Sequence, residues 1–421
     1  MRQYWIPCAL SSELAADGAP MRLPLLGEKL IAFRDSSGRV GIMDHRCPHR
    51  CASLFLGRNE KDGLRCVYHG WKFDTAGNCV DMPSVPEGEA LKHKIHAKAY
   101  KAAERNGMIW VYMGPNQEAP PPLPQIEPNL LPEGEAVYSM VFRSCNWLQA
   151  LEGEIDTSHF GFLHMGAVAS EELDESHRLF GPTVDRAPQY EVIETPWGTS
   201  YGAFRHLPQG GVYWRTANFL FPFWTQNPAG PISKYVHARA WVPIDDTRTM
   251  FVNMHWKEAR ERPPQPPLKS GRELDVGYQT FDNLLPNTTD WYGRWRLQEN
   301  ESNDWMIDRE AQSTGVSYTG IGNIHLQDQS VTESMGPITD HRWEHLTSAD
   351  LMIARTRRRI LRAARAFRET GAPPPGIADP EVLLQARGGH FVAEEGKSWQ
   401  DAYAENLATV ERPVEKLAGD R

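Results

Sequence analysis

The chain has 421 residues, of which 40% are hydrophobic and 24% charged, and its formal net charge is −9. This length predicts two or more structural units, and the composition is that of a globular protein. The negative charge argues against a nucleic-acid partner, and no apolar run approaches the roughly 18 residues of a membrane span. The N-terminus lacks the basic start and apolar stretch of a signal peptide, so we expect a soluble cytoplasmic protein.

The N-terminal region, up to about residue 117, is predicted to form short strands broken by Gly, Asp and Pro. The stretch "KLIAFRDSSGRVGIMDHRC" predicts a hairpin with its turn at "DSSG", and "GMIWVYMG" predicts a further strand. A proline-rich stretch then predicts a stiff linker over 118–136. Six cysteines are too few for a disulfide framework, yet four of them lie between positions 47 and 79, which indicates metal binding.

Two mixed pairs of ligand-type residues lie in this region. "HRCPHRC" places Cys47 two positions before His49, and "RCVYHG" places Cys66 three positions before His69. Unliganded residues and a Cys₂His₂ zinc site are two interpretations, but zinc fingers pair Cys with Cys and His with His. A Rieske [2Fe–2S] centre fits better, with Cys47 and Cys66 on one iron and the two histidines on the other.

The stretches "CPHR" and "CVYHGWKFDTAGNC" resemble the Rieske domain of ring-hydroxylating oxygenases. In that family a small residue such as Gly often stands at the position of Cys51. Neither Cys51 nor Cys79 has a ligand role that we can assign, and we interpret both as structural thiols.

The second region opens with the strand-like "AVYSMVFRS" and a predicted helix, "NWLQALEGEIDTSHFGFLH". On this helix Glu152, Asp156 and His159 are spaced by four and three residues and share one face. His164 follows His159 by five residues, about 140° around a regular helix. Both histidines can therefore bind one metal only if the helix bends or ends there, which Gly161 would permit.

Further along the chain, four aromatic-rich strands are predicted in "TSYGAFRHL", "GVYWRTANFLFPFW", "KYVHARAWVPI" and "TMFVNMHW". From about residue 338 the pattern becomes helical. It includes the basic run "ARTRRRILRAARAFRET", which we interpret as a solvated helix face.

Two histidines and one carboxylate form the facial triad of non-haem Fe(II) oxygenases. The Glu-x₃-Asp-x₂-His-x₄-His pattern resembles the mononuclear iron motif of Rieske oxygenases. Its carboxylate comes from a distant segment, where Asp304, Asp308 and Asp328 are candidates. In relatives the ligand Asp is followed five residues later by Glu; Asp328 with Glu333 fits best, and we select it. His325, one turn earlier, is expected near the pocket.

Over nearly its whole length the chain resembles the α subunit of a Rieske non-haem iron aromatic oxygenase of the phthalate dioxygenase group. "NDWMIDREAQSTGVSYTGIGNIHLQDQSVTESMGPITD" and "NFLFPFWTQ" are the stretches of closest likeness. The resemblance implies an α+β fold, with an all-β Rieske domain over 1–117. A helix-grip catalytic domain over 137–421 would follow, with an antiparallel sheet around a long helix.

The implied reaction is insertion of oxygen from O₂ into an aromatic substrate, with a [2Fe–2S] cluster and Fe(II) as cofactors. The electrons would come from a separate NAD(P)H-dependent reductase with flavin and a ferredoxin-type cluster, because this chain has no GxGxxG or flavin-binding pattern. The resemblance also implies a homotrimer, in which Asp156 links His159 to His69 of the neighbouring subunit.

Relatives in this group act on aromatic acids, which need a positively charged partner in the pocket. Arg205 and Arg215 flank the "LPQGG" turn and are candidates, since a guanidinium binds a carboxylate in a bidentate fork. A solvent-facing position on the sheet is equally open for either. Two other functions stay open: an aryl-ether O-demethylase, which uses the same metals, and a Rieske electron carrier without a mononuclear iron.

Overall fold

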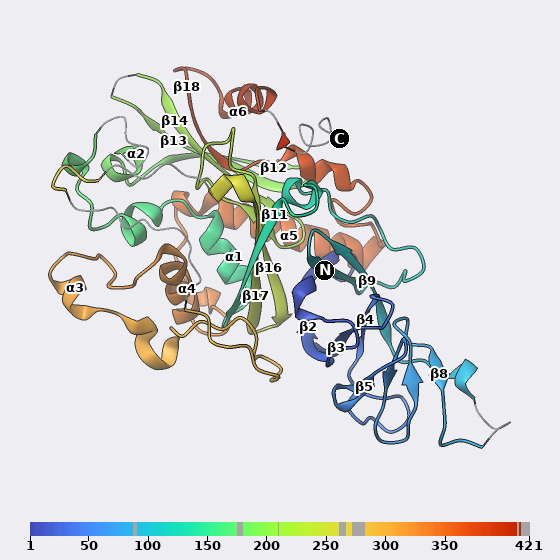
Figure 1. Cartoon of the computed structure of the whole chain (residues 1–421). Helices are drawn as coiled ribbons and strands as arrows, with labels where there is room; N and C mark the ends of the chain where they lie inside the picture. Colours follow the sequence, from blue (N-terminus) through green and yellow to red (C-terminus); the bar gives the residue numbers. More distant parts are fainter. Residues whose placement is uncertain are drawn as a thin grey trace.

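The computed structural model describes residues 1–86, 91–174, 180–208, 210–260, 267–271, 283–410 and 412–413. The N-terminal region is all β (Figure 1), as the sequence predicts. Its larger sheet has the strand order β1-β10-β9-β4-β3-β2. The strands are β1 (Trp5–Leu10), β2 (Met21–Leu25), β3 (Glu28–Arg34), β4 (Val40–Asp44), β9 (Ala99–Arg105) and β10 (Met108–Tyr112). A small second sheet joins β5 (Arg58–Asn59), β6 (Leu64–Arg65), β7 (Lys72–Phe73) and β8 (Cys79–Asp81).

The second region is built on an antiparallel sheet with the order β11-β17-β16-β15-β14-β13-β12, and β18 pairs with β14. The strands are β11 (Ala136–Arg143), β12 (Gln189–Thr195), β13 (Gly198–His206), β14 (Val212–Leu220), β15 (Trp224–Gln226), β16 (His237–Asp245), β17 (Arg248–Trp256) and β18 (Gly389–Ala393). The α-helices of the described residues are α1 (Trp147–Ile155), α2 (Phe180–Val184), α3 (Arg309–Ser313), α4 (Ile324–Ser334), α5 (Leu351–Thr370) and α6 (Trp399–Ala408).

This sheet is covered on both faces, which explains its strand sequences. Every residue of β14 is buried, and so is nearly all of β16, so neither strand alternates between apolar and polar residues. Helix α1 packs against β14, β15 and β16, and α5 packs against β12 and β13. Strands β1 and β2 of the N-terminal region also contact β16. The predicted α+β class, a β domain followed by an antiparallel sheet with helices, is confirmed.

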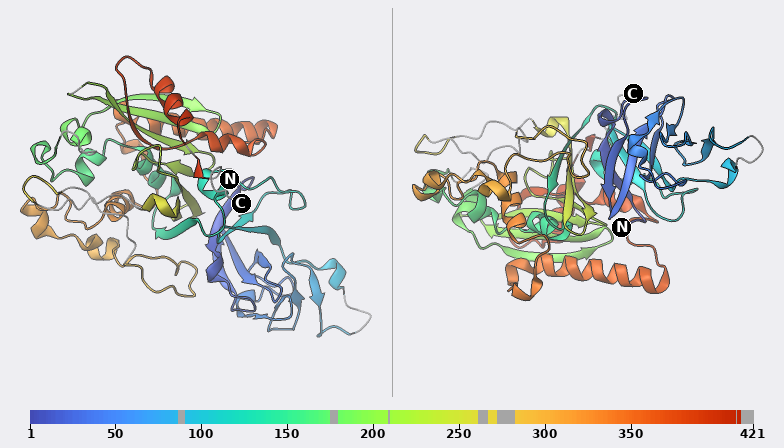
Figure 2. Two further views of the ribbon diagram at one scale, coloured as in Figure 1. Left: turned by 45° about the horizontal axis from the view of Figure 1, so that its top comes forward. Right: turned by 90° about the horizontal axis from the view of Figure 1, so that it is seen from below.

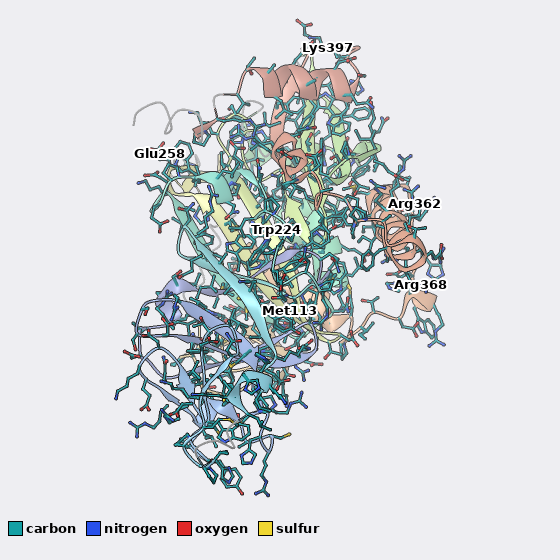
Figure 3. The ribbon with its side chains drawn as sticks, turned by 90° about the vertical axis from the view of Figure 1, so that its right-hand side faces the viewer. Met113, Trp224, Glu258, Arg362, Arg368 and Lys397 are labelled. Carbon is teal, nitrogen blue, oxygen red and sulfur yellow. The ribbon has the colours of Figure 1, made fainter. Side chains whose placement is uncertain are left out.

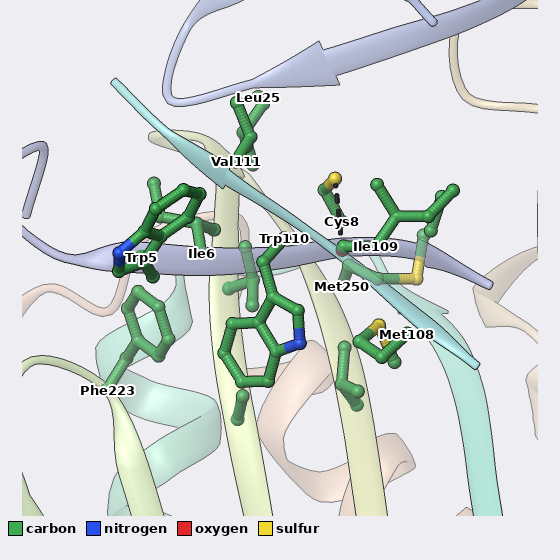
Figure 4. Close-up of a cluster of buried hydrophobic side chains, with 14 of the residues drawn as sticks. Trp5, Ile6, Cys8, Leu25, Met108, Ile109, Trp110, Val111, Phe223 and Met250 are labelled. Atoms are coloured by element: carbon green, nitrogen blue, oxygen red, sulfur yellow. Dashed lines mark hydrogen bonds between the residues drawn. The ribbon is translucent and has the colours of Figure 1, made fainter. Parts of the chain in front are cut away.

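The two regions share one hydrophobic core (Figure 4). The ring centroids of Trp110 on β10 and Trp224 on β15 lie 5.8 Å apart. Trp5, Phe223 and Met250 belong to the same buried cluster. Figure 3 shows Met113 and Trp224 at this junction. Burial of large aromatic side chains between the sheets fixes the N-terminal region on the antiparallel sheet of the second region.

The proline-rich segment 118–136 is packed against the protein rather than free. It contains the 3₁₀ turn η4 (Glu127–Leu130). Ile126 is 0% and Glu127 1% exposed, and Glu127 accepts a 3.0 Å hydrogen bond from the guanidinium of Arg387. No described helix is both long and apolar enough to cross a bilayer.

The basic helix α5 differs between its two halves. Arg357 donates to Glu152 on α1 and to Glu344, both at 2.6 Å, so the first half is tied to the protein by ion pairs. The second half is exposed, with Arg362 and Arg368 on the outer surface (Figure 3). The prediction of a solvated face is therefore correct for the second half only. It fails for the first half because the carboxylates of Glu152 and Glu344 bind Arg357 there.

Candidate metal centres

The first candidate centre lies in two short loops of the N-terminal region. Cys47 and Cys66 are 1% and 3% exposed. The two loops are closed in the same way, because the Cys51 N–H donates to the Cys47 carbonyl at 2.9 Å and the Gly70 N–H donates to the Cys66 carbonyl at 3.0 Å. Each loop thus presents one sulfur and one imidazole from a single tight turn.

The two histidines of these loops face one another. The ring centroids of His49 and His69 lie 4.4 Å apart, and His49 also stacks on Trp71 at 4.4 Å. The Nδ1 atoms of both histidines are buried and have no hydrogen-bond partner among the described residues. A buried polar nitrogen without a partner is costly unless another group binds it. Two thiols with two imidazoles whose Nδ1 atoms are available fit a Rieske cluster.

The two remaining cysteines of this region differ in environment. Cys79 is 6% exposed and packs in the same hydrophobic core as Cys47 and Cys66, as a structural thiol would. Cys51 is exposed and has a left-handed backbone conformation with φ 60°. The interpretation of Cys51 as a packed structural thiol is therefore wrong, since its side chain lies on the surface.

The helix predicted to reach His164 ends much earlier. Helix α1 ends at Ile155, with Asp156 as its C-cap residue, and the π-helical turn η5 (Phe160–His164) follows. In a π turn the hydrogen bond joins residues five apart, as the Met165 N–H does with the Phe160 carbonyl at 3.1 Å. Residues five apart therefore return to one side, which solves the spacing problem of the two histidines.

The histidine side chains meet an aspartate of α4. The Nε2 atoms of His159 and His164 lie 3.2 Å apart. Asp328 Oδ1 lies 3.5 Å from the first and 3.1 Å from the second. One ligand atom from each residue falls within 4.8 Å of the others. Two imidazoles and one carboxylate in this arrangement fit the 2-His-1-carboxylate donor set of non-haem Fe(II).

The other two aspartate candidates lie elsewhere. Asp304 and Asp308 are both exposed. Asp304 has a left-handed backbone with φ 52°, and Asp308 caps α3 by accepting a 2.9 Å hydrogen bond from the Ala311 N–H. The structure brings neither of them to the histidines.

Asp156 lies beside the site on the outer side of His159. Its Oδ2 is 3.5 Å from His159 Nδ1, and its Oδ1 accepts a 2.7 Å hydrogen bond from the Ser158 N–H. Burial opposes a charged ring, but the hydrogen bond and charge of Asp156, with the charge of Asp328, raise the pKa of His159 to about 9. Burial likewise opposes the Asp328 carboxylate, yet His164 and His159 hold its pKa well below the ordinary value. The site therefore favours positive charge at the position where the three ligand atoms meet.

Some of the acidic residues near this site have other partners. The sequence predicts that Glu152 shares a helix face with Asp156 and His159, but it does not, because α1 ends at Ile155, before the histidines. The Glu152 carboxylate is instead bound by Arg357. Glu154, which the sequence did not single out, is buried against Arg239 at 2.6 Å.

The sequence also missed two polar residues behind the triad. Gln327 Oε1 lies 2.7 Å from His164 Nδ1. Arg143 is 0% exposed, and its guanidinium lies 3.4 Å from the ring of His325. His325 itself is 2% exposed, and its ring centroid lies 4.9 Å from that of Phe251, so it belongs to the core beside Asp328. In the sequence, the one indication of a role for Gln327 is that it directly precedes Asp328. That position does not predict which residue its side chain contacts.

Arg205 on β13 and Arg215 on β14 are buried, 3% and 6% exposed, so neither faces solvent. Arg215 Nε donates to Thr157 Oγ1 at 2.9 Å, and its guanidinium lies 4.6 Å from the ring of Phe160 in the π turn. Arg205 Nη1 is buried without a hydrogen-bond partner among the described residues. Burial and the charge of Arg215 lower the pKa of Arg205 to about 10. Two neighbouring buried cations indicate a place for an anion.

Comparisons with known proteins show which family the chain belongs to. Residues 4–101 match the Rieske [2Fe-2S] domain, and residues 111–415 match the LigXa C-terminal domain like family. The chain is 48% identical over 407 residues to the 3-chlorobenzoate-3,4-dioxygenase oxygenase subunit of Comamonas testosteroni, covering 97% of this chain and 94% of that protein. It is 35% identical to the phthalate 4,5-dioxygenase oxygenase subunit of Pseudomonas putida, covering 96% and 90%.

Among solved structures, dicamba monooxygenase bound to dicamba has a TM-score of 0.55 at 18% identity, covering 86% of this chain and 96% of that one, which shows the shared fold. Both of these curated relatives are named as oxygenase subunits of dioxygenases, which use O₂. The electron-carrier alternative, which had no oxygenase activity, does not agree with this relationship. The chain belongs to the Rieske non-haem iron oxygenases and is an oxygen-using oxidoreductase with a [2Fe–2S] cluster and a mononuclear iron.

Proposed function

We propose that this protein is the terminal oxygenase component that inserts oxygen from O₂ into a carboxylated aromatic ring. The observation that supports this substrate class is the pair of buried guanidinium groups, Arg205 and Arg215. Among the described residues, no carboxylate forms an ion pair with either of them, and Arg205 Nη1 has no hydrogen-bond partner there. Arg215 contacts Phe160, whose ring centroid lies 5.6 Å from that of His164, so the pair lies near the triad. The relatives named above act on 3-chlorobenzoate and phthalate, which are both aromatic acids.

In this proposal His159, His164 and Asp328 hold Fe(II), while Cys47 and Cys66 with the two loop histidines hold the [2Fe–2S] cluster. When bound, the iron supplies the activation of O₂ and the cluster supplies single electrons. The residues of the chain orient the reactants. The two arginines would bind the carboxylate by charge-assisted hydrogen bonds and so fix which ring edge faces the triad.

We further propose that electrons reach the triad from a neighbouring copy in a homotrimer. Figures 1 and 2 show the strands β5 and β8 at the far end of the molecule from α1 and α4. Asp156, whose side chain is 25% exposed, would link His159 to His69 of the next copy. Val67 and Tyr68, which precede His69, are 55% and 54% exposed and would form an apolar contact there.

The cluster would be reduced by a separate NAD(P)H-dependent reductase with flavin and a ferredoxin-type cluster. The proposed division of the chain is 1–117, 118–136 and 137–421. We place the protein in the cytoplasm because none of the six cysteines, all of them described, forms a disulfide, which is the state expected in a reducing compartment.

The test is product analysis with ¹⁸O₂, a surrogate reductase and a panel of benzoates, phthalates and methoxybenzoates. We expect ¹⁸O in a hydroxylated ring of an aromatic acid. Formaldehyde together with a phenol from a methoxybenzoate would instead identify an O-demethylase. Absence of substrate-dependent O₂ consumption with every acid, in protein that holds both metals, would overturn the proposed substrate class.

The role of the arginines is tested by Arg205→Gln and Arg215→Gln. Loss of a charge-assisted hydrogen bond costs on the order of 1.5–3 kcal/mol, so we expect KM for the acid to rise about 10- to 150-fold. The neutral amide analogue should be affected far less. Arg387→Gln is the matched control, because Arg387 is buried but already paired with Glu127. Equal effects on acid and amide would assign the arginines to structure.

A further inference from the structure

We propose that Gln327 is a positioning residue for the mononuclear iron, because it fixes both the ring orientation and the tautomer of His164. This inference rests on the proposed triad of His159, His164 and Asp328. It assigns a role to a residue that is not itself a metal ligand.

The hydrogen bonds of Gln327 leave one orientation for its amide. Gln327 Oε1 lies 2.7 Å from His164 Nδ1, and Gln327 Nε2 donates to the Ile321 carbonyl at 2.9 Å. A backbone carbonyl only accepts, so the amide NH₂ must face Ile321 and the amide oxygen must face the histidine. An amide oxygen also only accepts, so the proton of this contact sits on His164 Nδ1. The Nε2 atom is thereby left as the metal-binding atom of the ring.

This hydrogen bond is shielded from water, which makes it an effective restraint. Gln327 is 8% exposed and the His164 side chain 3% exposed. A water molecule cannot easily replace the amide as the acceptor at such a site, so loss of the oxygen leaves a buried N–H unsatisfied.

Helix α4 would then control two of the three ligands through consecutive residues. Asp328 provides one ligand atom, and Gln327 holds the ring that lies 3.1 Å from it. The other ring, His159, has a carboxylate partner from its own segment, Asp156 at 3.5 Å. A neutral amide orients the second ring without adding another negative charge to the site. The position of α4 against the π turn thus sets the spacing between His164 and the carboxylate.

A purely structural role for Gln327 makes a different prediction, and Gln329 provides the matched control. Gln329 lies on the same helix, is 3% exposed, and donates to Glu333 Oε1 at 2.9 Å and to the Phe142 carbonyl at 3.3 Å. No hydrogen bond joins it to a triad residue among the described residues. Removal of either amide should lower thermal stability, but only removal of the Gln327 oxygen should weaken metal binding.

The experiment is a spectroscopic Co(II) titration of the full-length protein, with its cluster assembled and the mononuclear site stripped by chelation. For Gln327→Leu we expect the Kd for Co(II) to rise 10- to 100-fold, the usual effect of losing the partner of a ligating histidine. Gln327→Glu keeps an oxygen acceptor for His164 while it loses the donor to Ile321. It should therefore restore Co(II) affinity close to wild type even if its melting temperature falls. Gln329→Leu should bind Co(II) like wild type.

Wild-type Co(II) affinity in Gln327→Leu would overturn the inference, and so would an equal loss of affinity in Gln329→Leu. Asp328→Ala separates this failure from failure of the proposed triad. If Asp328→Ala binds Co(II) normally, the triad itself is wrong. If Asp328→Ala abolishes binding while Gln327→Leu does not change it, only the positioning role is wrong.

Discussion

The two metal centres of this protein are encoded over very different lengths of chain. The four proposed cluster ligands lie within residues 47–69, and each loop is closed by its own backbone hydrogen bond. The triad instead joins the π turn after α1 to Asp328 on α4, with strands β12 to β17 between them in sequence. The first centre therefore depends on local turns. The second depends on how two distant segments pack, so changes in one centre should leave the other intact.

The largest expected effect comes from removing the distant ligand. In Asp328→Ala the site loses its only carboxylate among the three grouped ligand residues, so we expect loss of mononuclear iron and of turnover by orders of magnitude. The visible absorption of the cluster should stay at the wild-type level. Iron analysis, optical spectra and O₂ uptake of the purified variant measure these three quantities.

The exposed aspartates are the controls for this variant. Asp304→Ala and Asp308→Ala remove carboxylates of the same type that lie on the surface, so iron content and turnover should change little. Loss of iron in either of them, with iron retained in Asp328→Ala, would show that the structure pairs the wrong carboxylate with the histidines.

The next largest effect concerns the connection between the centres. Asp156→Asn keeps the shape of the side chain and removes its charge beside His159, at a position 3.5 Å from Nδ1. If Asp156 links the histidine to His69 of a neighbouring copy, reoxidation of the reduced cluster should slow by orders of magnitude. The reductase should still reduce the cluster. Stopped-flow reoxidation, normalised to iron content, measures the rate, and a wild-type rate per occupied site would contradict the link.

The same difference explains what could be predicted from the sequence. The proposed cluster ligands are predicted from two short spacings, which the structure brings together in two adjacent loops, and the strands are predicted from their aromatic and β-branched composition. The five-residue spacing of His159 and His164 predicts that the helix bends or ends near Gly161. The π turn and the earlier helix end could not be predicted, because the spacing of Glu152, Asp156 and His159 fits one continuous helix, whereas α1 ends at Ile155. The partner of Glu152 is Arg357 and the partner of Gln327 is His164, and both partners lie far away in the sequence. No periodicity of the sequence predicts either contact.

A smaller and purely electronic effect is expected at the cluster. His69→Cys replaces a neutral imidazole by a thiolate, and the added negative charge disfavours reduction. The potential should therefore fall from the Rieske range of roughly −150 to +300 mV toward the roughly −400 mV of an all-cysteine cluster. Protein-film voltammetry measures the shift, and His49→Cys should give a shift of the same sign. Metal affinity of the triad should be unchanged, and an unchanged potential in both variants would contradict the assignment of these histidines as ligands.

The smallest expected effect tests how self-contained the cluster loops are. Cys51 is exposed and holds φ 60°, a conformation that costs a residue with a Cβ about 1–2 kcal/mol relative to glycine. Replacement by glycine removes this cost, but glycine also has greater conformational freedom in the unfolded chain, which offsets about 0.5–1 kcal/mol of the stabilisation. We therefore expect Cys51→Gly to raise the free energy of unfolding by up to about 1.5 kcal/mol. The potential should not change, since the N–H of residue 51 still donates to the Cys47 carbonyl.

Cys79→Ala is the contrasting variant, because Cys79 is 6% exposed and its loss leaves a small cavity in the cluster core. Urea titrations followed by cluster absorption should move the two midpoints in opposite directions. A lower midpoint or a shifted potential in Cys51→Gly would show instead that the Cys51 side chain acts on the cluster.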